Sequence, residues 1–314
     1  MLWTPDVEAL DLLDRIGGPF ERVGYRAACV ETQPLLTDQS FGARAADGTQ
    51  AAVALLADAR SADSVPFGYG AVRSTRPLTP TEALSLLDAA RGRARRRRLV
   101  LRAIRPLGGL PIGRQIATTS IVTLDKPPEN RFEAQARRKI RRAERRGCSV
   151  SATSFAESFL RLHNAAARSR HARYPDALVR RLAERNELTF YNGVVDGEVV
   201  SSIAAFTRGE HWMYWLGAQD ERGRAVEAGY AVVASLLAAA YAAGIPFVNL
   251  GASEGLPGVA TFKQRLGGVE QPVDQVVLAT ALVRIVDGAM DSMRTASTGL
   301  RTNTVRLSRR LGLR

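Results

Sequence analysis

Two stretches of the 314-residue sequence decide the fold: residues 132–150, FEAQARRKIRRAERRGCSV, and residues 258–268, GVATFKQRLGG. In the first stretch apolar residues recur at Phe132, Ala136, Ile140 and Ala143. This spacing predicts a helix with one narrow apolar stripe and a mostly cationic surface. Asn130 and Glu133 have the spacing of a capping box at its start, and Gly147 stands where a left-handed residue would end it before the strand-like CSVSAT.

The chain between the two stretches predicts one complete α/β unit. Helices are expected at residues 156–167 and 175–185, followed by three strands, LTFYNGVV, EVVSSIAAF and HWMYWLGA. The dipeptides Asp196-Gly197 and Arg208-Gly209 are tight-turn signals, so the three strands should form an antiparallel meander. A long Ala-rich helix to about Ala243, ended by Gly244, then leads to the short buried strand PFVNL.

The first third of the chain predicts a mixture of strands and helices. We expect a helix at residues 7–16, a strand at residues 25–31, and a hairpin whose turn is Asp47-Gly48. A helix from Pro80 to about Arg97, with Thr79 as its cap, should precede the buried strand LVLRAI. Strands that begin as a meander and end among helices fit an α/β or α+β domain.

The helix ending at Gly147, the strand–strand–strand–helix–strand order and the later F-K-x-x-x-G at residues 262–267 together resemble the Fem-type aminoacyltransferases that build peptidoglycan cross-bridges. They also resemble the wider GCN5-related acetyltransferase superfamily. The resemblance covers residues 118–278 and implies an α/β (α+β) protein with two acetyltransferase-like domains, each a mixed sheet flanked by helices. The domains are expected at residues 1–125 and 126–279, and residues 280–314 should form a basic helical tail that packs back on the first domain.

The net charge of +13 is concentrated in two clusters. Residues 91–98 contain six arginines, and residues 137–146 contain seven basic residues and one acid. Such clusters indicate an anionic partner: transfer RNA, the pyrophosphate of coenzyme A, a lipid-linked phosphate or an anionic membrane surface, with DNA not expected. An arginine-rich composition throughout the chain is the alternative explanation. The two cysteines form no disulfide framework and no metal site is indicated.

The superfamily binds the pyrophosphate of coenzyme A at a loop before the central helix, with Gln or Arg at its first position and Gly and Gly or Ala later. Here residues 219–225 contain this pattern with Asp220 in the first position. The candidate cofactor-binding residues are Arg222, Gly223, Arg224 and Ala225. A carboxylate beside a pyrophosphate is repulsive, which puts coenzyme A binding by this loop in doubt.

The resemblance also implies the catalytic and acceptor-binding residues. Lys263 matches the family's functional lysine, expected to stabilise an oxyanion or a terminal phosphate, and Tyr214 matches a substrate-facing tyrosine on the third meander strand. The expected substrate-binding residues are Arg170, Tyr174, Phe262 and Glu254. Surface or core packing is the alternative role for each. Strand alternation predicts that Trp212, Tyr214 and Leu216 share one face.

These observations favour a cytoplasmic acyltransferase that moves an aminoacyl group from aminoacyl-tRNA to an anionic, amine-bearing acceptor such as a peptidoglycan precursor, with no tightly bound cofactor. The N-terminus lacks a basic signal-peptide region and no membrane-spanning run is present, while peripheral contact with the inner membrane face stays open. One alternative is an acyl-CoA-dependent N-acyltransferase of the same superfamily. A second is a non-catalytic protein that binds RNA or membrane.

Overall fold

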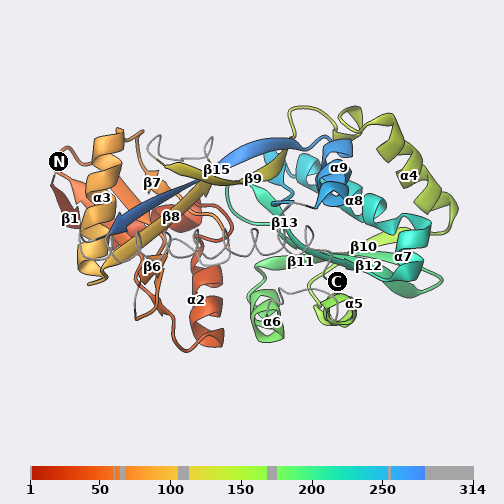
Figure 1. Cartoon of the computed structure of the whole chain (residues 1–314), viewed down its shortest axis with the longest axis horizontal. Coiled ribbons are helices and arrows are strands. Elements are labelled where there is room, and N and C mark those ends of the chain that lie inside the picture. Colours follow the sequence, from red (N-terminus) through yellow and green to blue (C-terminus); the bar gives the residue numbers. More distant parts are fainter. Residues whose placement is uncertain are drawn as a thin grey trace, which may run out of the picture.

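The structure is a computed structural model that describes residues 2–59, 61–63, 68–104, 113–167, 175–253 and 256–279. Its strands form two sheets. The smaller has the order β1-β3-β4-β7, and the larger runs β10-β11-β12-β13-β14-β9-β15-β8-β6-β5-β2. The larger sheet is continuous from the C-terminal elements at one end of the molecule to the N-terminal elements at the other (Figure 1).

The N-terminal elements are short except for two helices, α2 and α3, and two strands, β8 and β9. They are β1 (Trp3–Pro5), a 3-10 turn (Glu8–Leu10), α1 (Asp11–Arg15), α2 (Val23–Thr32), β2 (Thr37–Asp38), β3 (Phe41–Ala45), β4 (Gln50–Val53), β5 (Leu56–Ala57), β6 (Ser61–Asp63), β7 (Val72–Ser74), α3 (Pro80–Arg93), β8 (Arg98–Ile104) and β9 (Arg114–Thr123).

The helix α3 and the β3–β4 hairpin confirm the sequence prediction. Thr79 caps α3 by accepting a hydrogen bond from the Glu82 amide, and the Glu82 side chain returns one to the Thr79 amide. In the hairpin, Gly48 has a φ of +85°, which only glycine adopts at little cost. Both elements are determined by local residue chemistry, which the sequence displays directly.

The C-terminal elements follow the predicted order. They are a 3-10 turn (Pro128–Asn130), α4 (Ala134–Arg145), β10 (Ser149–Thr153), α5 (Glu157–Ala167), α6 (Asp176–Glu184), β11 (Leu188–Val195), β12 (Glu198–Phe206), β13 (Trp212–Gln219), α7 (Glu221–Val226), α8 (Ala228–Ala242), β14 (Phe247–Asn249), α9 (Pro257–Arg265) and β15 (Val269–Ala279). The strands β11, β12 and β13 form the expected antiparallel meander. The Asp196-Gly197 turn and the helix end at Gly244 are also as predicted, with Gly197 and Gly244 at positive φ.

Helices cover both faces of the meander. On one face α2, α5 and α6 contribute large apolar side chains such as Tyr25, Phe159 and Leu178, which are buried against Phe190 and Phe206 of the strands. On the other face α8 is buried along most of its length against Ile203, Val248 and neighbouring strand residues. The helix α4 packs outside α8 through Ala136 and Ala143. The meander is therefore the middle layer of an α/β/α arrangement.

Two local predictions are wrong. Residues 25–31 are not a strand but lie in α2, where Tyr25, Ala28 and Cys29 are buried at helical spacing against α6. The expected capping box is absent as well, because Asn130 ends a 3-10 turn and Glu133 is itself the residue before α4. Gly147 does end the α4 segment as predicted, with a φ of +76°.

The strand β9 had no counterpart in the sequence prediction, and it is central to the sheet. It pairs antiparallel with β14 on one side and with β15 on the other. The strand β15 continues past β9 to pair with β8. The sheet therefore runs without a break across the predicted domain boundary at residue 125, and the boundary itself stays a prediction. The predicted tail, residues 280–314, lies outside the described residues.

Candidate functional site

The parallel strands β13 and β14 pair over only two residues and then part. The paired residues are Trp212 with Val248 and Met213 with Asn249. From this pairing two arms diverge, residues 214–225 on one side and residues 250–253 and 256–263 on the other, and we call this region the fork. In parallel α/β sheets, ligands bind where neighbouring strands diverge at their carboxyl ends. The fork is therefore the candidate site.

The base of the fork is closed by an aromatic pair. His211 and Phe247 each lie one residue before the paired residues of β13 and β14, and their rings stack with their centroids 4.7 Å apart. His211 is 5% exposed, and burial together with the nearby positive charge of Arg73 lowers its pKa to about 3. The imidazole is therefore neutral near pH 7 and acts as a packing residue at this point.

Arg73 is held in place beside His211 by two carboxylates. Its guanidinium contacts fully buried Glu21 at 2.6 Å and the partly exposed Glu210 at 2.6 Å. Glu21 also accepts hydrogen bonds from the amides of Gly18 and Ala71. These contacts connect the N-terminal elements to the loop before β13. The positive charge of Arg73 is thereby paired with the two carboxylates next to it.

A β-bulge redirects the side chains of β13 just beyond the base. Ala204 of β12 pairs with Leu216 and Ala205 pairs with Tyr214, so Trp215 is an extra residue without a partner on β12. Trp212 and Tyr214 share one face, as predicted, and this face packs toward α8, whereas Leu216 packs with Trp215 and Met213 on the opposite face. The prediction that Leu216 shares the face of Tyr214 is wrong, because one inserted residue reverses the alternation.

The bulge and the early end of β14 leave one edge of β13 without a neighbouring strand. No β14 residue pairs with β13 after Met213 within the described part of the chain. Backbone N–H and C=O groups on such an edge need partners, and an extended ligand can supply them by lying along the strand. This edge can donate N–H groups to a carbonyl oxygen on which negative charge develops.

Tyr214 lies on the α8 side of this arm. It belongs to the same cluster as Tyr230 of α8 and Phe262 of α9, whose rings meet edge-to-face with centroids 4.7 Å apart. The Tyr214 hydroxyl lies against Gly217, where any side chain would clash with it. Gly217 therefore allows the hydroxyl to lie next to the backbone of the free edge.

Lys263 lies under the other arm. It is 3% exposed, and its Nζ donates hydrogen bonds to the carbonyl oxygens of Gly251 at 2.9 Å and Ala252 at 2.6 Å. Gly251 has a φ of +78°, a conformation that favours glycine. The ammonium thus fixes the loop after β14 in a turn that brings two carbonyls together. This buried position differs from the alternative of a surface helix lysine.

Asn249 is a further polar residue of this arm, and the sequence analysis did not single it out. It is completely buried, and its Oδ1 accepts hydrogen bonds from Thr119 Oγ1 at 2.7 Å and from the Gly251 amide at 2.8 Å. Its Nδ2 has no hydrogen-bond partner among the described residues. The available signal was an amide residue, in PFVNL, at the end of an otherwise apolar buried strand.

The loop after β13, predicted to bind an anion, is the short helix α7. Asp220 precedes α7, and its carboxylate accepts a hydrogen bond from the Gly223 amide at 2.7 Å. Arg222 pairs with Asp196, Arg224 donates to the Gln219 carbonyl, and the Ala225 carbonyl accepts from Arg146. The Gly223 amide and the guanidinium groups of Arg222 and Arg224 therefore have partners within the protein.

The remaining predicted site residues, Arg170, Tyr174 and Glu254, lie outside the described residues. In the part of the chain that the structure describes, no helix has the length and apolarity needed to cross a bilayer. The same part contains no group of three or more His, Cys, Asp and Glu side chains arranged to hold a metal ion.

The fork, the bulged third strand and the surrounding helices define an acyltransferase fold of the GCN5-related type. Residues 130–264 match the family model of the acetyltransferase (GNAT) domain, so the chain contains a GNAT domain and the predicted acyltransferase class is confirmed. No curated protein is matched by the sequence.

Solved structures show the same fold at low identity. The structure of FemX has a TM-score of 0.67 and 14% identity, covering 89% of this chain and 98% of its own. The C-terminal domain of a "Putative Lysylphosphatidylglycerol Synthetase" from Agrobacterium fabrum has a TM-score of 0.59 and 13% identity, covering 92% and 95%. A tandem GNAT protein from the clavulanic acid biosynthesis pathway has a TM-score of 0.50 and 15% identity, covering 88% and 98%. The Fem-like, two-domain GNAT architecture predicted from the sequence is thus supported.

Proposed function

We propose that this acyltransferase moves an aminoacyl group from an aminoacyl-tRNA to an amine of an anionic small acceptor. The neutral amine nitrogen attacks the ester carbonyl carbon, and a C–N bond forms. The ester C–O bond then breaks, the tRNA ribose oxygen leaves as a hydroxyl, and the proton lost by the amine balances the one that the ribose oxygen gains. An amide and a deacylated tRNA are the products.

The loop after β13, which forms the start of α7, is the observation on which the proposed donor depends. We call it the corner after β13. In the resembling superfamily this corner holds the pyrophosphate of coenzyme A on free backbone amides. In this chain the Asp220 carboxylate already accepts from the Gly223 amide, and a pyrophosphate there would meet a negative charge and lose that donor. A donor whose phosphates bind elsewhere, such as a tRNA, avoids this conflict.

Groups from both arms of the fork would take part in the transfer. The free edge of β13 offers backbone N–H groups to the ester carbonyl, where an oxyanion develops during attack. Lys263 holds the turn at Gly251 and Ala252 and places a positive charge beneath the same region. The Tyr214 hydroxyl, next to Gly217, would orient the amine or the ester. For Arg170 and Tyr174 we keep the predicted role of binding the acceptor's phosphate.

Two of the three structural neighbours described above support an aminoacyl group. One carries a name for an enzyme that makes lysylphosphatidylglycerol, in which lysine is joined to a lipid, and the neighbour with the higher TM-score is FemX. The acyl-CoA alternative has two favourable observations: Gly223 and Ala225 occupy the positions that the coenzyme A signature requires, and the structure of the tandem GNAT neighbour is described as one without acetyl-CoA. The two donors are therefore the alternatives to be separated by experiment.

Thermal unfolding with each donor analogue separates them, since a ligand that binds only the folded state raises the melting temperature. We expect deacylated tRNA to raise it at low salt and to lose most of that effect at high salt. Coenzyme A and acetyl-CoA should produce no shift. A shift with coenzyme A that persists in moderate salt, and none with tRNA, would overturn the proposal in favour of an acyl-CoA enzyme.

The Asp220→Gln variant tests why the unmodified protein should show no thermal shift with coenzyme A. It places the superfamily's usual residue at the first position of the loop and removes the carboxylate from the Gly223 amide. If Asp220 is what excludes coenzyme A, the variant should gain a thermal shift with coenzyme A that the unmodified protein lacks. A transfer assay with charged tRNAs, tested one amino acid at a time, then identifies the aminoacyl group.

A further inference from the structure

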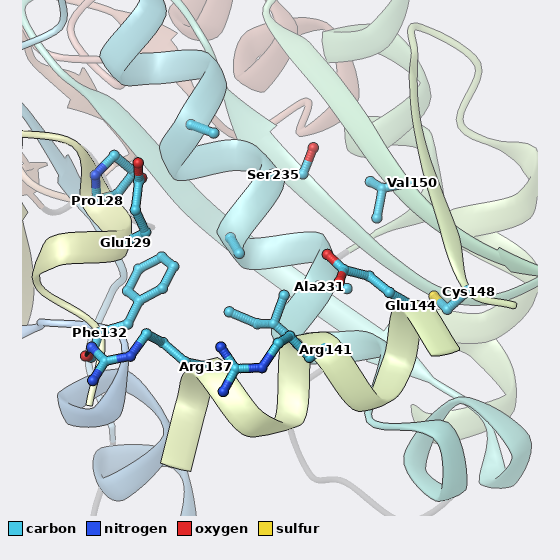
Figure 2. Close-up of a pocket in the computed structure, with 13 residues that line it drawn as sticks. Pro128, Glu129, Phe132, Arg137, Arg141, Glu144, Cys148, Val150, Ala231 and Ser235 are labelled. Atoms are coloured by element: carbon cyan, nitrogen blue, oxygen red, sulfur yellow. Dashed lines mark hydrogen bonds between the residues drawn. The ribbon is translucent and has the colours of Figure 1, made fainter. Parts of the chain in front are cut away.

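A hollow away from the fork lies between α4 and α8 and has no role in the proposed transfer. Its volume is about 500 Å³, within the range of small-molecule pockets. None of its lining residues comes from β13, β14 or the loops that follow them. Figure 2 shows the side chains of α4 and α8 that face it.

The floor of the hollow is apolar because small side chains of α8 face larger ones from the α4 segment. Ala231, Ala234 and Ala238 lie on the α8 side, opposite Phe132 and Ile140. The alanines leave the space between the helices unfilled, so apolar surface stays accessible there. Ser235 and Cys148 also line the hollow, and burial raises the pKa of the Cys148 thiol, which keeps it neutral.

Basic side chains of α4 border the hollow, and we call Arg137, Arg138, Arg141 and Arg142 its basic rim, although only Arg137 and Arg141 line the hollow itself. Arg137 and Arg141 line it on the α4 side, together with the acids Glu129 and Glu144. Within the described part of the chain, Arg138, Arg141 and Arg142 make no ion pair, and all three are exposed. Lys139, by contrast, is paired with Glu227 at 2.9 Å. The charges of the lining side chains cancel, so the net positive charge beside the hollow comes from Arg138 and Arg142, which lie on α4 next to the lining residues.

We propose that this hollow and its basic rim bind an anionic membrane lipid, with one acyl chain in the hollow and the phosphate on Arg141 and its neighbours. The apolar floor matches an acyl chain and the unpaired arginines match the phosphate, so both halves of such a lipid have a counterpart. RNA would use the arginines but has no need for the apolar floor. This inference goes beyond the proposed transfer and does not depend on it.

The packing of α4 determines how the protein meets the membrane. Its apolar stripe is already used against α8, since Ala136 and Ala143 are fully buried. The helix therefore has no free apolar face to insert into a bilayer, unlike a typical interfacial amphipathic helix. The lipid chain enters the protein instead, and α4 lies along the headgroups with its exposed arginines.

Vesicle co-sedimentation tests the basic rim. We expect the full chain to bind vesicles of phosphatidylcholine mixed with phosphatidylglycerol and not vesicles of phosphatidylcholine alone. The triple variant Arg138→Gln/Arg141→Gln/Arg142→Gln should weaken binding about tenfold or more. The matched control is Arg93→Gln/Arg95→Gln/Arg97→Gln, which removes the same charge from exposed arginines at the other end of the molecule (Figure 1) and should change binding about twofold or less. Equal losses in both variants would overturn the proposal, because they would indicate non-specific attraction.

A groove-filling variant tests the apolar floor. Ala238→Trp should fill the hollow and weaken binding to the anionic vesicles about fivefold, most clearly at high salt where the electrostatic part is screened. The control is Ala242→Trp, because Ala242 is also exposed on α8 but does not line the hollow. Melting temperatures of both variants report whether they fold. Unchanged vesicle binding by a folded Ala238→Trp protein would overturn the acyl-chain site.

Two further probes separate the sources of phosphate. Glycerol phosphate, the headgroup without a chain, should bind at least about tenfold more weakly than the vesicles do. A short RNA hairpin should bind the α4 triple variant and the unmodified protein alike. If the triple variant instead loses RNA binding and keeps vesicle binding, α4 is an RNA surface and the lipid proposal is wrong. The transfer assay is a separate readout, so failure here leaves the proposed function intact.

Discussion

The two arms of the fork diverge from the paired residues Met213 and Asn249, but side chains of opposite charge hold their backbones in place. After β13 a carboxylate, Asp220, accepts from a backbone amide, and after β14 an ammonium, Lys263, donates to two backbone carbonyls. In each case the chain satisfies its own backbone with a charged side chain. The first arrangement repels an anion and the second keeps a cation buried near the diverging strands. The comparison teaches that the two segments that leave the diverging strands use side chains of opposite charge for the same structural role, so the two arms differ in the charge that they present to a ligand.

The largest effect is expected at Lys263. Lys263→Met removes the donor from two buried carbonyls and the charge beneath the fork, so the free energy of unfolding should fall by about 3 kcal/mol. Transfer should fall by about 100-fold or more if the charge also stabilises the oxyanion. Urea unfolding and a single-turnover assay measure the two effects.

A matched variant separates position from charge. Arg265→Met removes a cation from the same helix, α9, without touching the carbonyls of Gly251 and Ala252. It should leave stability within about 0.5 kcal/mol and transfer within about threefold. If both variants slow transfer equally, the arm after β14 contributes only general positive charge, and the contrast between the arms disappears.

The base of the fork should make stability pH-dependent through His211. The folded pKa of about 3 lies below the ordinary value near 6.5, so the unfolded chain takes up a proton that the folded protein does not. The contribution of neutral His211 to the free energy of unfolding is therefore fully present above about pH 6.5. It is lost as the pH falls, by about 1.4 kcal/mol per pH unit down to about pH 3.

His211→Phe keeps a ring stacked on Phe247 but cannot titrate. Unfolding experiments between about pH 7 and pH 4 should show a shallower loss of stability in the variant than in the unmodified protein. Carboxylates titrate in the same range in both proteins, so the difference between the two slopes is the quantity to compare. Identical slopes would mean that His211 is already protonated in the folded state.

The sequence displayed the local elements of the fork better than its geometry. The meander, the turns at Asp196-Gly197 and the helix end at Gly244 were predictable because each depends on a few adjacent residues. The bulge at Trp215 was not, since it is defined by pairing with β12 and leaves no trace in residue type. The predicted role of Lys263, to stabilise an oxyanion or a terminal phosphate, stays a prediction, and the structure adds its hydrogen bonds to the carbonyls of Gly251 and Ala252, which the F-K-x-x-x-G motif does not reveal.

A smaller effect is expected where Tyr214 meets Gly217. Gly217→Ala would clash with the Tyr214 hydroxyl and move the end of the ring, so transfer should fall about tenfold with little change in stability. Tyr214→Phe removes the hydroxyl, which is the atom nearest to the added Cβ, and leaves two ring carbons at 2.9 and 3.0 Å from it, so it relieves most of the clash. The double variant should therefore transfer no worse than Tyr214→Phe alone, as a double-mutant cycle would show. Full activity in Gly217→Ala would assign Tyr214 to core packing.

The smallest effect is expected at Asp220, and it tests the opposite arm directly. Asp220→Ala removes the cap of α7 and should lower the free energy of unfolding by about 1 kcal/mol, whereas Asp220→Asn should lower it only slightly, because asparagine also caps helices. If the carboxylate excludes pyrophosphate by charge, both variants should gain affinity for coenzyme A. If it excludes pyrophosphate by occupying the Gly223 amide, only Asp220→Ala should gain it, since asparagine would keep that hydrogen bond. Calorimetric titration with coenzyme A decides between the two, and no gain in either variant would mean that Asp220 does not determine the donor.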